Sequence, residues 1–367
     1  MTTHEINWGK CIEVCSDGAK AMSGKVRGVV ALIKNVAKNC NSTHCILQRY
    51  ALVTKRISAT FKSVLDEAVK IINFIKSKPL QSRIFKAMCE DMGSLHTTLL
   101  LHTEVRWLSR GQMLVRIFQL RMELMAYFIG HKFELSDRLN NMACLSTLAY
   151  LADIFRKLNE LCLALQGKQV NILQAKDKLV AFSRKLQYWI SAVKQNNFEC
   201  FQTLSDFLEE SEVDLDMEIR DGIKTHLSSL QQSLGDYFPN LENQDNYWVQ
   251  NPFKIKEKPK DFIPWIKNMI ELISDTQLEA KFRTVSLTIF WSDVFDEYPN
   301  LAKQAIRILL PFATTYLCEA GFSKYVATKT KYRNKLDAAP DMRIQLSNLT
   351  PNFKRIMESK KQVHPSH

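Results

Sequence analysis

The sequence predicts a mainly helical fold with a small strand-bearing segment near its amino-terminal end. From Ala51 onward, apolar residues recur every three or four positions over most of the chain, which is the period of an amphipathic helix. Before that point, Ile12–Cys15 is a short segment with three apolar residues that leads into Asp17-Gly18, as expected for a buried strand followed by a turn. Hydrophobic residues make up 46% of the 367 residues, with only 11 Gly and 10 Pro, so the chain can bury a sizeable core.

The amino-terminal segment is predicted to hold two strands and one helix. After the strand at Ile12–Cys15, residues Lys20–Lys38 are expected to form a single helix, because apolar residues recur along it at helical spacing. His44–Leu47 is expected to be a second short strand. The expected apolar face of the helix consists of Met22, Val26, Val29, Val30, Ile33 and Val36.

Four later stretches carry apolar stripes at helical spacing. Such stripes are usually core-facing surfaces of a helical bundle rather than partner sites. The stripes are Leu114, Ile117, Phe118, Leu124, Met125 and Phe128; Leu151, Ile154, Phe155, Leu158, Leu161, Cys162 and Leu165; Leu179, Phe182, Leu186, Trp189 and Val193; and Ile219, Ile223, Leu227, Leu230 and Leu234. Residues 235–264, which contain four prolines and alternating lysines, are expected to form an irregular connection.

Charge and cysteine content restrict the environment and the partners. The net charge of +12 is compatible with a polyanionic partner but is weak support by itself. Nine irregularly spaced cysteines and no apolar leader indicate reduced thiols in the nucleus or cytoplasm, and no run reaches the ~18 apolar residues of a membrane span. One interpretation of Cys11, Cys15, Cys40, His44 and Cys45 is a set of zinc ligands. No two of these residues have the two-residue spacing of a zinc knuckle, so buried structural thiols are favoured.

The segment Leu309–Leu336 places one carboxylate between an apolar run and a basic run. Glu319 is followed by five cations and by few acidic residues. This pattern suits either a metal-binding carboxylate beside a phosphate-binding face or a helix with a solvated basic end. The five cations are Lys324, Lys329, Lys331, Arg333 and Lys335, interleaved with Tyr325 and Tyr332.

Three groups of motifs resemble hAT-superfamily (hobo/Ac/Tam3) DNA transposases, especially the branch domesticated into BED-zinc-finger-type host proteins. Cys15–Met22 resembles the strand-end motif that carries the second catalytic aspartate, and Glu104–Gly111 resembles the Arg-Trp motif. The carboxyl-terminal signature is matched by Tyr298–Ala302, Pro311-Phe312, Thr314–Ser323 and Lys329–Leu336.

The resemblance implies an RNase H-like α/β core, here incomplete and interrupted by a large all-helical insertion. It divides the chain into a sheet and helix remnant at 1–57, a helical insertion at 58–290, a carboxyl-terminal segment at 291–350 and a tail at 351–367. In the family, the carboxyl-terminal block is associated with dimerisation, so the resemblance implies a homo-oligomer in the nucleus, with DNA as a further partner. The BED zinc finger of many relatives is absent from this sequence.

In the family, two aspartates and a glutamate hold two divalent metals for strand cleavage and transfer. By position, Asp17 is the second aspartate and Glu319 the glutamate, while the first aspartate should lie well upstream. Three strands need about 30–40 residues, yet only sixteen precede Asp17, and Gln48 replaces a family histidine. We therefore expect a protein that is not an enzyme and needs no cofactor, with Asp17 and Glu319 as vestigial metal ligands.

The resemblance also implies DNA-contacting residues. The Arg-Trp motif supplies Arg106, Trp107 and Arg110; the tryptophan could stack on a flipped base, although a core position is the commoner role. The cations from Lys324 to Lys335 form the second candidate DNA surface. Two alternatives stay open: a Mg²⁺-dependent transposase or nuclease that is active only in a longer form, and a fragment with no function.

Overall fold

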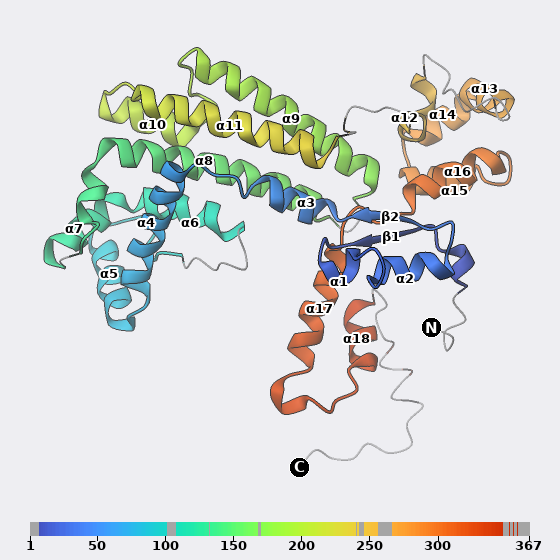
Figure 1. The fold of residues 1–367 in the computed structure, drawn as a ribbon, viewed down its shortest axis with the longest axis horizontal. Coiled ribbons are helices and arrows are strands. Elements are labelled where there is room, and N and C mark those ends of the chain that lie inside the picture. The colour runs from blue at the N-terminus through green and yellow to red at the C-terminus, as the bar shows by residue number, and fades with distance from the viewer. Residues whose placement is uncertain are drawn as a thin grey trace. The chain divides into compact units, whose positions relative to one another are not determined.

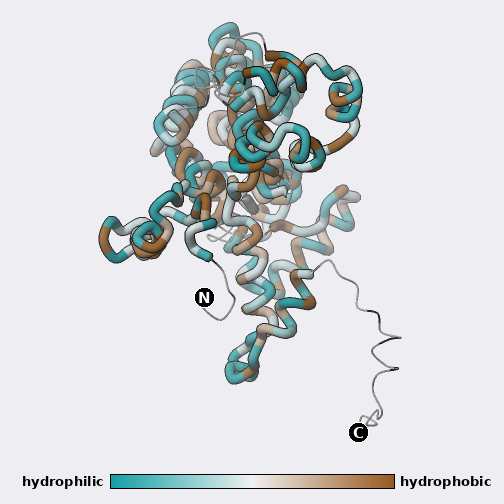
Figure 2. The backbone as a smooth tube through the Cα atoms, turned by 90° about the vertical axis from the view of Figure 1, so that its right-hand side faces the viewer, coloured by the Kyte–Doolittle hydropathy of each residue, from teal (hydrophilic) through white to brown (hydrophobic). Residues whose placement is uncertain are grey.

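The computed structural model describes residues 7–100, 108–131, 133–167, 170–239, 241, 246–255, 266–347, 352, 355 and 358, except for the side chains of 108–110. Its contacts divide the chain into two units, residues 1–314 and 315–367. The architecture is mainly helical with one small sheet (Figure 1). Figure 2 shows hydrophobic and hydrophilic residues alternating along the tube, as amphipathic helices require.

The sheet of the first unit consists of two parallel strands, β1 (Glu13–Ser16) and β2 (Asn41–His44). Glu13 pairs with Asn41 and Ser16 with His44, so both strands end on the same side. Parallel strands need a crossover connection, and here short helices supply it. These are α1 (Lys20–Ser23) and α2 (Val29–Val36), preceded by the 3₁₀ turn η2 (Trp8–Lys10).

The prediction of one continuous helix over Lys20–Lys38 was wrong. Gly24 caps α1, and α2 begins only after Gly28, whose added Cβ would lie 2.4 Å from the carbonyl oxygen of Gly24. This close backbone approach bends the chain between the two helices, and only glycine permits it. The expected apolar face is also largely exposed, because no residue of α2 is buried and Val29 and Val36 are 41% and 59% exposed.

The prediction of a strand at His44–Leu47 was also wrong. The second strand ends at His44, and α3 (Ile46–Val53) starts two residues later. Its buried residues Ile46, Leu47, Tyr50 and Val53 follow the helical period, and the Tyr50 hydroxyl donates a hydrogen bond to the Leu158 carbonyl at 2.9 Å. Tertiary packing on the central helix therefore stabilises helical backbone where four β-compatible residues suggested a strand.

A helical bundle forms most of the first unit, with α8 (Met142–Leu165) at its centre (Figure 1). All seven predicted core residues of α8 are buried, as are the predicted stripes of α9 and four of the five residues in the α11 stripe. The first predicted stripe is divided between two helices that meet at Leu120. The bundle elements around α8 are α4 (Ala59–Lys76), α5 (Pro79–Asp91), α6 (Leu108–Gln119), α7 (Arg121–Gly130), η3 (Ser136–Asn140), α9 (Ile172–Lys194), α10 (Gln202–Ser211) and α11 (Met217–Tyr237).

A smaller cluster of short helices completes the first unit. Its core contains Trp248, Phe290, Trp291 and Leu301, and the Trp291 indole donates a hydrogen bond to the Val249 carbonyl at 3.0 Å. Part of the expected irregular connection at 235–264 is thus ordered into helical turns. The elements are α12 (Tyr247–Gln250), η4 (Pro252–Lys254), α13 (Ile266–Ser274), α14 (Thr276–Phe282), α15 (Leu287–Asp293) and α16 (Pro299–Leu309).

The second unit contains a helical hairpin. It is built from α17 (Tyr316–Thr328), the turn η6 (Lys331–Arg333) and α18 (Ala339–Leu346). The boundary between the two units follows Thr314. The sequence-based division at residues 57, 290 and 350 stays a prediction.

Candidate functional sites

Asp17 lies where the sequence placed it, directly after β1 and before Gly18. Its carboxylate is exposed and accepts a hydrogen bond from the Ala19 backbone N–H at 3.2 Å. This is the geometry of an aspartate that stabilises a turn before a helix. The local role of Asp17 in the described structure is therefore that of a turn residue.

The imidazole of His44 lies beside this turn. A Cβ added to Gly18 would be 2.7 Å from His44 Cε1, so any other residue next to Asp17 would require the imidazole to move. Partial burial and the nearby Arg49 guanidinium lower the pKa of His44, while Cys45 and Asp17 oppose the shift. His44 was not predicted to lie beside Asp17, because the second strand was expected to begin at His44, whereas in the parallel register both strands end at this point.

The amino-terminal cysteines form two pairs at or near the ends of the two strands. Cys11 Sγ and Cys40 Sγ are 3.5 Å apart, and burial raises the pKa of Cys40 to about 11. A hydrogen bond with Cys45, together with burial, raises the pKa of Cys15 far above its ordinary value. Among the described residues, no three His, Cys, Asp or Glu side chains are grouped as a metal site requires. These thiols therefore pack as two pairs beside the ends of the strands.

Glu319 lies in the first turn of α17 with an exposed side chain. The Thr315 hydroxyl donates a hydrogen bond to its carboxylate at 3.1 Å. Asp17 and Glu319 belong to different units, so their approach to a shared site stays a prediction.

The basic residues of the carboxyl-terminal segment lie along the hairpin. The Lys324 ammonium donates to the Gln345 carbonyl, and the Lys329 ammonium is 5.8 Å from the centre of the Tyr325 ring. Lys331, Arg333 and Lys335 are exposed in and after the 3₁₀ turn between the helices. A phosphate can reach the last three cations without breaking a contact within the hairpin.

The Arg-Trp motif is the other predicted DNA contact. Arg106 and Trp107 lie outside the described residues. Arg110 belongs to α6, and its side chain is likewise outside the described part. Their DNA contact stays a prediction.

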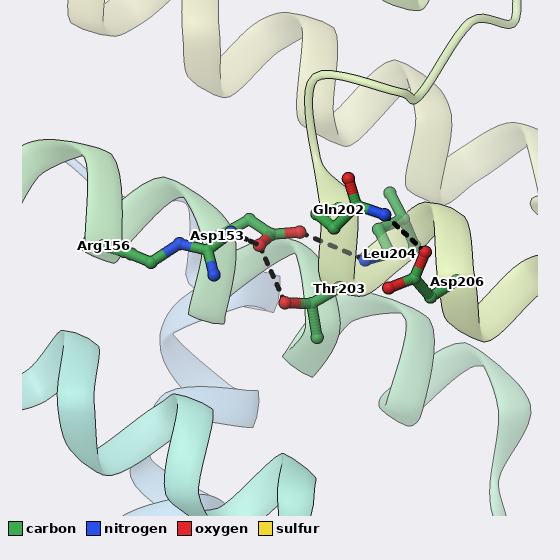
Figure 3. A network of polar contacts seen from close by, with 6 residues as sticks. All are labelled: Asp153, Arg156, Gln202, Thr203, Leu204 and Asp206. Carbon is green, nitrogen blue, oxygen red and sulfur yellow. Dashed lines mark hydrogen bonds and ion pairs between the residues drawn. The ribbon is translucent and has the colours of Figure 1, made fainter.

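One buried charged group was not anticipated from the sequence. Asp153 of α8 is fully buried, and its carboxylate accepts hydrogen bonds from the Thr203 hydroxyl at 2.8 Å and the Leu204 N–H at 3.1 Å (Figure 3). The Arg156 guanidinium, one turn further along α8, donates to it at 2.7 Å. Burial raises the pKa of Asp153, and these donors oppose the shift. The network fixes the first turn of α10 onto α8, so its role is structural.

Two segments match known protein families. Residues 269–347 match the hAT family C-terminal dimerisation region, and residues 44–194 match the FAM200/GTF2IRD2 helical domain. No solved structure matches the chain. Among the described residues, none of the helices combines the length and hydrophobicity that crossing a bilayer requires. Over these two segments, the chain is similar to hAT-derived, domesticated transposase-like proteins.

Proposed function

We propose that this protein is a non-enzymatic, transposase-derived nuclear protein that self-associates through its carboxyl-terminal segment and contacts DNA with the basic residues of that segment. The observation that carries the proposal is an unpartnered apolar face on α17, within the segment that matches the hAT dimerisation region.

The two faces of α17 have different surroundings within the hairpin. One face meets α18: Lys324 donates to the Gln345 carbonyl, the Gln345 amide donates to the Thr328 hydroxyl at 3.0 Å, and Gly321 approaches Leu346. These α17 residues recur at intervals of three and four, which places them on a single side of the helix.

A neighbouring face of α17 is apolar and exposed. Phe322 is 69% exposed, Tyr325 40% and Val326 68%, and Cys318 continues the stripe one turn earlier. No residue of α17 or α18 is buried. A helix of this length is marginal in water without apolar packing, so the exposed stripe requires a partner surface.

A second copy of the same segment is the partner that we infer. In a symmetric dimer each residue of the stripe is buried twice, once in each copy. Burial of a phenylalanine is worth about 2 kcal/mol, so Phe322 alone contributes about 4 kcal/mol to a dimer, or about a thousandfold in Kd.

The experiment is sedimentation equilibrium of the full chain across a range of concentrations. The variant Phe322→Ser with Val326→Ser should weaken dimerisation at least a hundredfold. Ile129→Ser is the matched control, because Ile129 lies in the last turn of α7 in the first unit and is 90% exposed. A wild-type chain that stays monomeric, or a control that dissociates equally, would contradict the proposal.

DNA contact is assigned to Lys331, Arg333 and Lys335. Their exposure around the 3₁₀ turn leaves them available to phosphates, and neutralising each one should reduce the salt dependence of duplex DNA binding by about one counterion. Triple substitution with glutamine should therefore flatten the plot of log K against log salt. Unchanged salt dependence would show that these three residues do not contact DNA.

The absence of catalysis is tested directly. We infer that β1, α1, α2 and β2 form part of an RNase H-like core in which Asp17 now serves the turn through the Ala19 N–H. Supercoiled plasmid should stay intact with Mg²⁺ or Mn²⁺. Nicking that Asp17→Ala and Glu319→Ala both abolish would instead support a metal-dependent nuclease.

A further inference from the structure

The first unit contains a half-open groove of about 1100 Å³ that no motif in the sequence marks. Its walls come from the amino-terminal half of α9, the start of α3, the residues after α11 and the short helix α12. The volume slightly exceeds the usual range of small-ligand pockets, about 300–1000 Å³, which leaves room for more than one nucleotide.

Arg49 supplies a half-buried cation to this groove. Its guanidinium lies 4.5 Å from the centre of the Phe238 ring and donates to the Tyr237 carbonyl at 3.2 Å. The Nε atom of Arg49 is buried and has no hydrogen-bond partner. Burial lowers the pKa of Arg49, and no ion pair joins it to a carboxylate among the described residues. An incompletely compensated cation of this kind favours a bound anion.

Two more cations project from α9. Lys176 and Arg184 are eight positions apart, about two turns, and both line the groove. Arg184 is exposed and forms no ion pair within the described part of the chain. The only carboxylate among the described lining residues, Asp177, already accepts the Gln250 amide at 2.5 Å. The described lining thus contributes three cations against one carboxylate, while Glu242 and Asp245 lie outside the described residues.

The wall formed by α12 adds an aromatic face and amides. Tyr247 is 41% exposed, and Asn246 and Asn251 line the groove beside it. A cationic track beside an exposed aromatic ring is the arrangement with which proteins hold single strands, because phosphates follow the charge and bases stack on the ring.

We propose that this groove binds single-stranded nucleic acid. Arg49, Lys176 and Arg184 contact successive phosphates, and a base stacks on Tyr247. An acidic peptide satisfies the cations but leaves the aromatic face unused, so the ring favours a nucleic acid. The proposal adds a second nucleic-acid surface to the proposed function and does not depend on self-association.

The test is fluorescence anisotropy of a fluorescein-labelled 15-nucleotide single-stranded DNA with the full chain. The variant Lys176→Gln with Arg184→Gln should bind at least tenfold more weakly, and its salt slope should fall by about 1.4. The matched control is Lys178→Gln with Lys185→Gln, which removes two charges from the same helix at positions that do not line the groove. Its affinity should stay within twofold of wild type.

A third variant separates stacking from charge. Tyr247→Ala should weaken binding at least fivefold while leaving the salt slope unchanged, because it removes a ring and no charge. Poly-glutamate should compete much less well than unlabelled oligonucleotide. Equal loss in the control pair, or equal competition by poly-glutamate, would overturn the proposal.

Sedimentation of the same proteins keeps the two proposals distinct. A wild-type chain that dimerises but does not bind the oligonucleotide disproves the groove proposal alone. A monomeric chain whose binding depends on Arg184 and Lys176 disproves self-association alone.

Discussion

Acid destabilisation of the helical bundle should be traceable to one buried histidine. His226 of α11 is 3% exposed, and its Nδ1 lies 2.8 Å from the Tyr150 hydroxyl. The edge of its ring faces Phe61, with centroids 5.7 Å apart at 89°. Because burial disfavours the imidazolium, the pKa of His226 falls from 6.5 to about 4.

The direction of the pH dependence follows from the pH at which the folded and the unfolded state each bind a proton at His226. Above pH 6.5 neither state is protonated at His226, so the bundle has its full stability with respect to this group. As the pH falls from 6.5 towards 4, the unfolded chain binds a proton that the folded bundle does not, and stability is lost. At about 1.4 kcal/mol per pH unit, the loss between pH 7.5 and pH 5 is about 2 kcal/mol.

The assay is urea unfolding followed by circular dichroism at several pH values between 7.5 and 5. His226→Asn is the comparison, because an asparagine amide can keep a hydrogen bond to Tyr150 and does not titrate. The variant should be less stable at pH 7.5, and its free energy of unfolding should decline by about 2 kcal/mol less than that of the wild type over this range. Parallel pH profiles would refute the reasoning, because the acid sensitivity would then arise elsewhere.

Three further predictions concern packing and thiols. Asp153→Ala should lower the free energy of unfolding by about 3 kcal/mol in urea titrations, because it leaves buried donors without an acceptor. Asp153→Asn should lower the free energy of unfolding by a smaller amount. Gly111→Ala should cost about 1–3 kcal/mol by the same measurement, since its Cβ would lie 3.0 Å from the backbone of Phe155 in α8; an unchanged stability would show that the two helices separate easily. Cys11 and Cys40 should form a disulfide when diamide accepts their two electrons and two protons, detected by peptide mapping and absent in Cys40→Ser.

Features that depend on a local periodic pattern were predicted from the sequence, whereas features that depend on particular tertiary or backbone contacts were not. The apolar stripes of α8 and α9 were predicted correctly because a helical period is a local property, visible in one or two turns. The first strand was predicted to within one residue for the same reason. The continuous helix at Lys20–Lys38 failed because the contact between the backbones of Gly24 and Gly28 has no periodic signature.

The candidate sites divide in the same way. Asp17 at a strand end and Glu319 on a helix could be located from motifs, and the structure shows both side chains exposed. The neighbourhood of Asp17 could not be located in this way, because His44 reaches Gly18 only through the pairing of two strands about thirty residues apart.

By itself, the sequence determined the helical class, the first strand near the amino terminus and the resemblance of the carboxyl-terminal segment, since each depends on neighbouring residues. The tertiary structure alone decided which charges are buried and which apolar faces stay uncovered. Asp153 is enclosed by residues fifty positions away, and the stripe around Phe322 is exposed because α18 packs on a different face of its helix. Burial is a property of packed elements, and a local pattern contains no information on which face of an element will be covered.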